Sequence, residues 1–195
     1  MIDNTLVLPI LIPLFSGALL CLWKKASVLR QITSLIIAMI ISTVSIQLVL
    51  DVLNTNARKI LPFGGWKAPI GIMLNGDILG LTMATLCSLV LIATLLYSIG
   101  ENQLEEENRL KLPLLFFITA GINLSFLTGD IFNLFVAFEI MLLSSYGLMT
   151  LKTQIDTTKF ALPYLTINLV GSTLFLCSAG LYYVLFGTLN FASIA

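Results

Sequence analysis

The stretch GDIFNLFVAFEIMLLSSYGL, from Gly129 to Leu148, contains a long apolar run from Ile131 to Leu148 that holds a single carboxyl group, that of Glu139. At about 1.5 Å per helical residue, Glu139 lies roughly 12 Å from one end of the run at Ile131 and about 13 Å from the other. A carboxyl at that depth would lie near the midplane of a bilayer. The stretch therefore predicts a transmembrane helix with an acidic group at its centre.

The composition of the whole chain supports a membrane protein. Hydrophobic residues make up 58% of the chain and charged residues 10%, and the mean hydropathy is +1.02. A typical soluble domain carries about 25% charged residues. The formal net charge of zero says nothing about partners, and the sequence has no phosphate-binding loop. No nucleic-acid role is indicated.

Six apolar stretches are long enough for transmembrane helices. They run from Thr5 to Trp23, Leu29 to Leu50, Ile78 to Ser98, Leu112 to Thr128, Ile131 to Thr150 and Phe160 to Phe186. Each is continuously apolar, whereas the strands of a membrane barrel alternate over about ten residues. We therefore predict an all-α fold, a polytopic bundle of six helices. Prolines inside the first and last helices require neighbouring groups to satisfy the carbonyls that they free.

The distribution of basic residues predicts the orientation, because Lys and Arg in short loops favour the cytoplasmic side. With the N-terminus outside, the cytoplasmic loops hold Lys24, Lys25, Arg30, Arg109, Lys111, Lys152 and Lys159. The external loops then hold Arg58, Lys59 and Lys67. We expect a multi-pass protein of the cell membrane with its N-terminus outside.

The cysteines give no sign of a cofactor. Cys21, Cys87 and Cys177 lie in three different apolar segments without C-x-x-C spacing, and the chain has no histidine. Zinc, haem and iron–sulfur sites use clusters of these residue types. We predict no metal and no cofactor, and expect three small buried side chains.

Polar residues in the helices are of two kinds. Small residues at four-residue spacing indicate faces where helix backbones approach closely; these are Ser34, Ala38 and Ser42 in the second helix, and Gly80, Ala84 and Ser88 in the third. The pairs Thr119 with Asn123 and Asn168 with Ser172 either bond helices together or line a hydrated path.

Glu139 differs from these groups because an ionisable side chain at a helix centre costs about 2.5–3.5 kcal/mol or more to insert. Among its helical neighbours only Tyr146 has a polar tip, and no predicted helix has a Lys or Arg at matching depth. Burial favours the protonated carboxyl, whereas a nearby cation favours the carboxylate, so movement of a cation would switch its proton occupancy. Glu139 is therefore either a proton relay or a protonated helix–helix contact.

Three motifs resemble a known family. The stretch from Gly129 to Leu148 closely resembles the fifth-helix signature of antiporter-like membrane subunits, in particular the D subunits of Mrp-type multisubunit sodium/proton antiporters. GGWKAPIGIMLNGD, from Gly64 to Asp77, resembles the family's hairpin and the start of its third helix. GTLNFASIA at the end is similar to the loop after the sixth helix, so the resemblance covers the whole chain.

The resemblance implies part of a fourteen-helix inverted-repeat fold. Residues 1–111 would form three N-terminal helices, with an external hairpin loop near 60–72 and a cytoplasmic loop near 100–111. Residues 112–195 would form the first three helices of the first proton-channel repeat. In the family, the glutamate matching Glu139 is expected to pair with a lysine on the seventh helix. That helix would lie beyond Ala195, so we expect a truncated chain or, as the alternative, a naturally split subunit.

The implied function is ion transport and not enzyme catalysis. A complex containing this subunit would exchange cytoplasmic Na⁺ for external H⁺, with Glu139 as the proton relay and other antiporter subunits as partners. Four further residues would line the path, namely Asn123, Tyr146, Asn168 and Ser172. Two alternatives stay open: a proton-translocating subunit of a redox complex, either an NADH:quinone oxidoreductase or a membrane-bound hydrogenase, and a structural membrane subunit.

Overall fold

The computed structural model describes residues 4–23, 28–63, 66, 71–100, 109–151 and 155–194. In chain order, its elements are η1 (Asn4–Val7), α1 (Leu8–Leu22), α2 (Val28–Thr55), β1 (Lys59–Pro62), β2 (Met73–Gly76), α3 (Ile78–Gly100), α4 (Lys111–Leu127), α5 (Ile131–Met149), α6 (Ile155–Phe186) and α7 (Phe191–Ile194). All six predicted helices are present, so the all-α prediction is confirmed, with one short β-hairpin added. Most of the predicted cytoplasmic loop near 100–111, namely residues 101–108, lies outside the described residues.

The ends of two helices differ from the predicted ends. The second helix continues from Leu50 to Thr55, and the sixth begins at Ile155 instead of Phe160. An apolar run marks the part of a helix that meets hydrocarbon, whereas the backbone can stay helical into the polar region beyond it. The sequence pattern therefore located the apolar parts of these helices and not their full lengths.

Five segments of the described chain are long and apolar enough to cross a membrane. They are Asn4–Leu22, Val28–Thr55, Ile78–Ile99, Ile131–Met149 and Ala161–Phe186. The remaining predicted span, Lys111–Leu127, is an apolar helix of 17 residues. It packs between α1, α3 and α5. These helices describe a multi-pass membrane protein.

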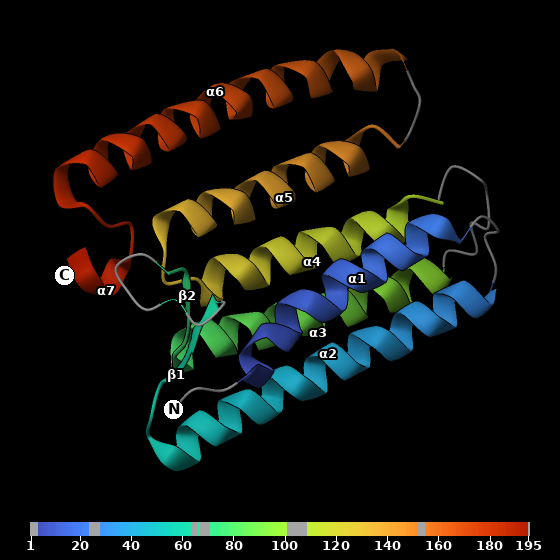
Figure 1. The fold of residues 1–195 in the computed structure, drawn as a ribbon. Helices are drawn as coiled ribbons and strands as arrows, with labels where there is room; N and C mark the ends of the chain where they lie inside the picture. The colour runs from blue at the N-terminus through green and yellow to red at the C-terminus, as the bar shows by residue number, and fades with distance from the viewer. Residues whose placement is uncertain are drawn as a thin grey trace.

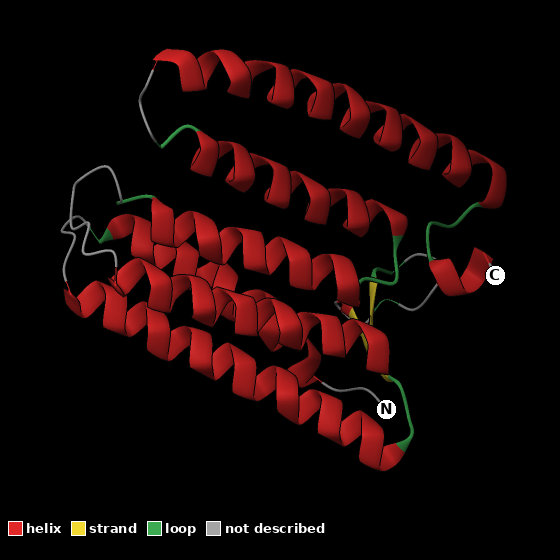
Figure 2. Ribbon diagram, turned by 180° about the vertical axis from the view of Figure 1, so that it is seen from behind, coloured by secondary structure: helices red, strands yellow, loops and turns green. Residues whose placement is uncertain are grey.

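The six long helices lie side by side along a common direction (Figure 1). At one edge of the bundle, α6 packs on α5, and α5 packs on α4. Helices α1 and α3 both contact α4, and both also contact α2. The hairpin, α7 and the N-terminal end lie at the same end of the bundle, as the view from behind also shows (Figure 2). One end of the bundle is therefore covered by the hairpin and the short helix α7.

The predicted small-residue faces of α2 and α3 are buried. Ser34, Ala38, Ser42, Gly80, Ala84 and Ser88 all fall in the buried class. The two helices also pack against each other. Small side chains let helix backbones approach closely; for Gly80 the neighbour is α4, because a Cβ there would lie 2.6 Å from the carbonyl oxygen of Phe126.

Glycine allows a similar approach between α4 and α5. A Cβ atom at Gly121 would lie 2.7 Å from Cγ of Met141 and 3.0 Å from the carbonyl oxygen of Ala137. Both distances are shorter than an ordinary van der Waals contact, so only glycine fits here without movement of α5. Ala137 and Met141 thus mark the face of α5 that meets α4.

The strands, the α4–α5 linker and the segment leading into α7 form one hydrogen-bonded unit at this end, which we name the hairpin junction (β1, β2, residues 128–130 and residues 188–192). The strands pair antiparallel, and β2 continues the pairing to the α4–α5 linker, where Gly129 N donates to the Met73 carbonyl at 2.8 Å. The linker pairs in turn with the segment after α6, because Phe191 N donates to the Gly129 carbonyl at 2.9 Å. The junction fixes the relative positions of α3, α5 and α6.

Two helices at the junction begin in the same way. Asp77 Oδ1 accepts a 2.8 Å hydrogen bond from Gly80 N at the start of α3, and Asp130 Oδ1 accepts a 2.9 Å bond from Asn133 N at the start of α5. The local sequences LNGDILGL and LTGDIFNL are correspondingly alike. An Asp before an apolar run is a typical helix N-cap, so this structural role was readable from the sequence.

Candidate functional site

Glu139 lies in the middle of α5 and is half-buried. Its Oε1 atom is fully buried and has no hydrogen-bond partner in the described part of the chain. Buried polar atoms in folded proteins are nearly always paired. Glu139 therefore has the property expected of a functional group whose partner is a proton, water or a group outside the described residues.

The orientation of Glu139 on α5 follows from the helix geometry. Successive residues turn by about 100° in an α-helix, so Glu139 is rotated by about 200° from Ala137, which faces α4. Phe135, one turn before Glu139, stacks on Phe175 of α6 with ring centroids 6.4 Å apart. Glu139 thus points away from α4 and lies on the side of α5 near its aromatic contact with α6.

Asn123, one of the predicted path residues, is completely buried in α4 and connects two helices. Its Nδ2 donates a 2.7 Å hydrogen bond to the carbonyl oxygen of Pro9 in α1. That carbonyl would pair with the N–H of residue 13 in an uninterrupted helix, but Pro13 has no N–H. Asn123 supplies the missing donor, which is the helix-bonding role that the sequence left open.

The polar groups of α6 bond within their own helix. Asn168 Nδ2 donates to the Tyr164 carbonyl at 2.9 Å, and Ser172 Oγ donates to the Leu169 carbonyl at 3.2 Å. Both side chains are half-buried, as is Tyr146 on α5. In the described part of the chain, no hydrogen bond joins these residues to one another or to Glu139. Their role as path residues stays a prediction.

Arg30 is a residue whose structural role the sequence did not indicate. It lies in the first turn of α2 with 2% of its surface exposed. Its Nη2 donates to the Leu20 carbonyl at 3.0 Å and to the Arg109 carbonyl at 2.5 Å. The guanidinium therefore joins the end of α1 to the start of α4. In the sequence, Arg30 was only one of the basic loop residues that predict the orientation of the chain.

The described residues contain no group of three or more His, Cys, Asp or Glu side chains that could hold a metal ion. The three cysteines are free, and Cys177 on α6 is exposed. The expectation of three buried thiols is therefore wrong for Cys177, because the face of α6 that carries it has no packing partner among the described helices, and Cys21 and Cys87 are only half-buried. The acidic group that stands out for function is Glu139.

The sequence is similar to staphylococcal antiporter subunits over almost its whole length. It is 41% identical over 194 residues to a Staphylococcus haemolyticus protein named "Putative antiporter subunit mnhD2", covering 99% of this chain and 38% of the relative. A Staphylococcus epidermidis protein of the same name is 38% identical over 196 residues. The chain thus spans about two fifths of the length of the curated relatives it matches. No family model matches the sequence.

Two solved structures share the fold. A chain of the archaeal membrane-bound sulfane sulfur reductase, a respiratory membrane complex, superposes with a TM-score of 0.90 and 27% identity, over 96% of this chain and 39% of that one. A chain of the Mrp complex from Dietzia sp. superposes with a TM-score of 0.84 and 28% identity, over 95% and 35%. These matches confirm the resemblance to Mrp-type D subunits that the three sequence motifs predicted.

Proposed function

We propose that this chain, which is homologous to Mrp-type antiporter subunits along its whole length, is part of a multisubunit cation/proton antiporter and carries a proton-relay group, Glu139. The observation that supports the relay is the buried and unpartnered Oε1 of Glu139 in the middle of a membrane-spanning helix. The predicted path residues on α4 and α6 differ from Glu139 in that each makes a side-chain hydrogen bond. Asn123, Asn168 and Ser172 each have a protein partner.

The relay would work through the two protonation states of one carboxyl group. A carboxyl group in general favours its protonated form in an apolar surrounding and its charged form beside a cation or water, so a change of surroundings can bind or release a proton. None of the described Lys or Arg side chains forms an ion pair with Glu139. A cation from another segment or subunit would complete the switch. This agrees with the orientation of Glu139, which points away from α4.

The path to Glu139 is proposed along the α5–α6 side of the bundle. Tyr146 lies two turns after Glu139 on α5, and Asn168 and Ser172 lie on α6, which packs on α5. Because the α6 groups bond only within their own helix, their remaining lone pairs and protons are available to water. Asn123 bonds α4 to α1 and so does not lie on this side of the bundle, although its buried Oδ1 has no partner and could accept a hydrogen bond from water.

Na⁺ is the proposed counter-ion, taken up from the cytoplasmic side in exchange for external H⁺. The proposed location is the cell membrane with the N-terminus outside, on the distribution of Lys and Arg. Other antiporter subunits are the proposed partners, since the matched Dietzia chain is part of an Mrp complex.

A second candidate function is proton translocation in a redox complex. The observation that favours it is the TM-score of 0.90 to a chain of the sulfane sulfur reductase. Both functions use a proton path in the membrane and differ in the energy source. The residues of this chain would serve either one.

Transport by membrane vesicles separates these functions. Vesicles from cells with the complete gene set should show a pH change when Na⁺ is added after the interior has been acidified, and vesicles lacking this chain should not. Proton uptake that requires an electron donor and ignores Na⁺ would show that the redox function is correct. Vesicles in which deletion of the chain changes neither activity would contradict both.

A further inference from the structure

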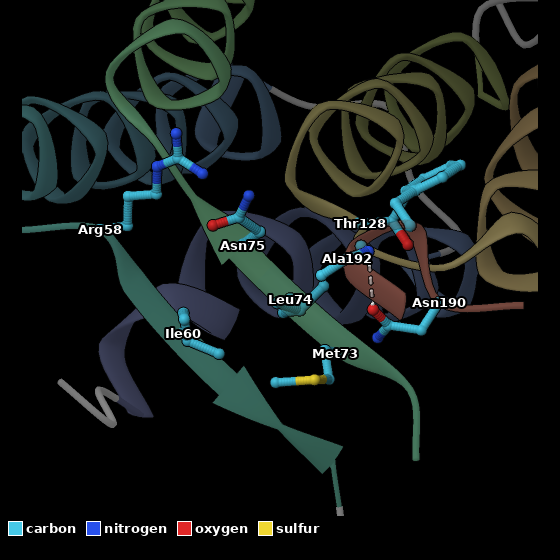
Figure 3. Close-up of a pocket in the computed structure, with 10 residues that line it drawn as sticks. Arg58, Ile60, Met73, Leu74, Asn75, Thr128, Asn190 and Ala192 are labelled. Atoms are coloured by element: carbon cyan, nitrogen blue, oxygen red, sulfur yellow. Dashed lines mark hydrogen bonds between the residues drawn. The ribbon is translucent and has the colours of Figure 1, made fainter. Parts of the chain in front are cut away.

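The hairpin junction contains a cavity that the proposed proton path does not use. Its volume is about 170 Å³, and its walls come from β1, β2, the linker after α4 and the segment that begins at Asn190 (Figure 3). The linker leaves α4 at Leu127 and enters α5 at Ile131. The cavity therefore lies where apolar helices end, which is the depth of the lipid head groups.

One wall of the cavity has a buried hydrogen-bond donor. Asn190 is 2% exposed, and its Oδ1 accepts a 3.0 Å bond from Ala192 N, drawn in Figure 3. This bond fixes the side-chain amide, whose Nδ2 is buried and has no partner. Because such donors are nearly always satisfied, the amide N–H indicates a ligand that offers an oxygen acceptor.

The opposite part of the cavity is cationic. Arg58 is an exposed lining residue and lies beside Asn75, with Met73 and Leu74 between them and Asn190 (Figure 3). None of the lining residues is acidic. The charge therefore favours an anion, and the apolar residues between the two polar ends favour a ligand that has carbon atoms between its oxygens.

We propose that this cavity binds the head group of an anionic phospholipid. The phosphate would pair with Arg58, whose guanidinium matches the geometry of phosphate oxygens. An ester carbonyl of the same lipid would accept the hydrogen bond from Asn190 Nδ2. Met73 and Leu74 would contact the glycerol and the first methylene groups. A bound lipid would thus hold β2 against the segment after α6.

Lipid binding to the full chain can be measured by native mass spectrometry in detergent, with phosphatidylglycerol added in increasing amounts. We expect one lipid to be retained. Arg58→Gln removes the cation, and Asn190→Asp removes the donor while keeping Oδ1 for Ala192 N. Each substitution should weaken binding by about tenfold or more, since each removes a hydrogen bond to the lipid or opposes its charge.

The matched control is Asn54→Asp, which makes the same chemical change at an exposed position at the end of α2. It should bind lipid as the unchanged protein does. The proposal would be overturned if Arg58→Gln, Asn190→Asp and the control Asn54→Asp all bound the lipid equally well, or if all three lost binding to the same extent. Inorganic phosphate at millimolar concentration should not displace the lipid; displacement would show a site for a free phosphate ion and would also overturn it.

Discussion

Asn123 in α4 donates a 2.7 Å hydrogen bond to the carbonyl oxygen of Pro9 in α1, the group that Pro13 leaves without a donor in its own helix. A proline in a membrane helix is tolerated when a neighbouring group satisfies the carbonyl one turn earlier. Here the neighbouring group is a buried side chain from a helix 114 positions away in the sequence. The two residues therefore form one structural unit.

Replacing Asn123 with Leu should lower the free energy of unfolding by about 1–3 kcal/mol, because the Pro9 carbonyl is left buried and unpaired. Adding Pro13→Ala should restore part of this loss, since the new N–H at position 13 can pair with the Pro9 carbonyl. The measurement is reversible unfolding of the purified chain in mixed micelles.

The rescue makes this double-mutant cycle specific. Asn168→Leu is the control, because Asn168 bonds a carbonyl of its own helix. Pro13→Ala should not improve the stability of Asn168→Leu any more than it improves that of the unchanged chain. Strictly additive effects of Asn123→Leu and Pro13→Ala would contradict the account of Asn123.

The contact between α4 and α5 should be sensitive to a single methyl group. Gly121→Ala places a Cβ 2.7 Å from Met141 Cγ and 3.0 Å from the Ala137 carbonyl, and we expect destabilisation by about 1–3 kcal/mol. Gly171→Ala in α6 is the matched control, because its Cβ would meet nothing within 4 Å. That change should be neutral or stabilising, by up to about 1 kcal/mol. Thermal unfolding of the two variants in the same detergent gives the comparison, and equal shifts would show that the α4–α5 approach is not tight.

The sequence was sufficient to predict the helices because membrane spans have a one-dimensional signal. Continuous apolar runs located all six, and small residues at four-residue spacing predicted buried packing faces on α2 and α3. These properties depend on residues close together in the chain. The same holds for the N-cap of α5, where Asp130 directly precedes the apolar run.

Contacts between distant segments could not be predicted in this way. No local pattern pairs Asn123 with Pro9, or places Arg30 between Leu20 and Arg109, because each contact depends on how the helices pack. The hairpin junction joins segments near positions 74, 128 and 190, which the sequence showed only as parts of three separate motifs. For Glu139, the sequence indicated a buried acidic group, while the structure added that it faces away from α4.

Arg30 should be sensitive even to a change that keeps its charge. Arg30→Lys loses the planar donor group that reaches the carbonyls of Leu20 and Arg109, and we expect a loss of about 1–3 kcal/mol in unfolding free energy. Arg58→Lys, at an exposed position, should leave stability unchanged. The comparison uses denaturant unfolding followed by circular dichroism. Equal stability of the two variants would mean that Arg30 does not join α1 to α4.

The orientation of the chain can be tested with single cysteines after the native cysteines have been replaced. Asn54→Cys places a thiol at the hairpin end of the bundle, and Leu110→Cys places one at the opposite end; both positions are exposed. With the N-terminus outside, an impermeant thiol reagent should label intact cells at position 54 and spare position 110. The reverse labelling would overturn the predicted orientation.

The central claim is that Glu139 moves protons, and Glu139→Gln tests it most directly. The amide keeps the size and much of the hydrogen-bonding capacity of the carboxyl but cannot release a proton. The measurement is the Na⁺-driven pH change in vesicles that contain the whole complex, with subunit levels checked by immunoblot. We predict that the Glu139→Gln complex assembles normally and has no antiport activity, and that Glu139→Asp retains part of it. Normal antiport by an assembled Glu139→Gln complex would contradict the relay and would show that Glu139 is a protonated helix–helix contact.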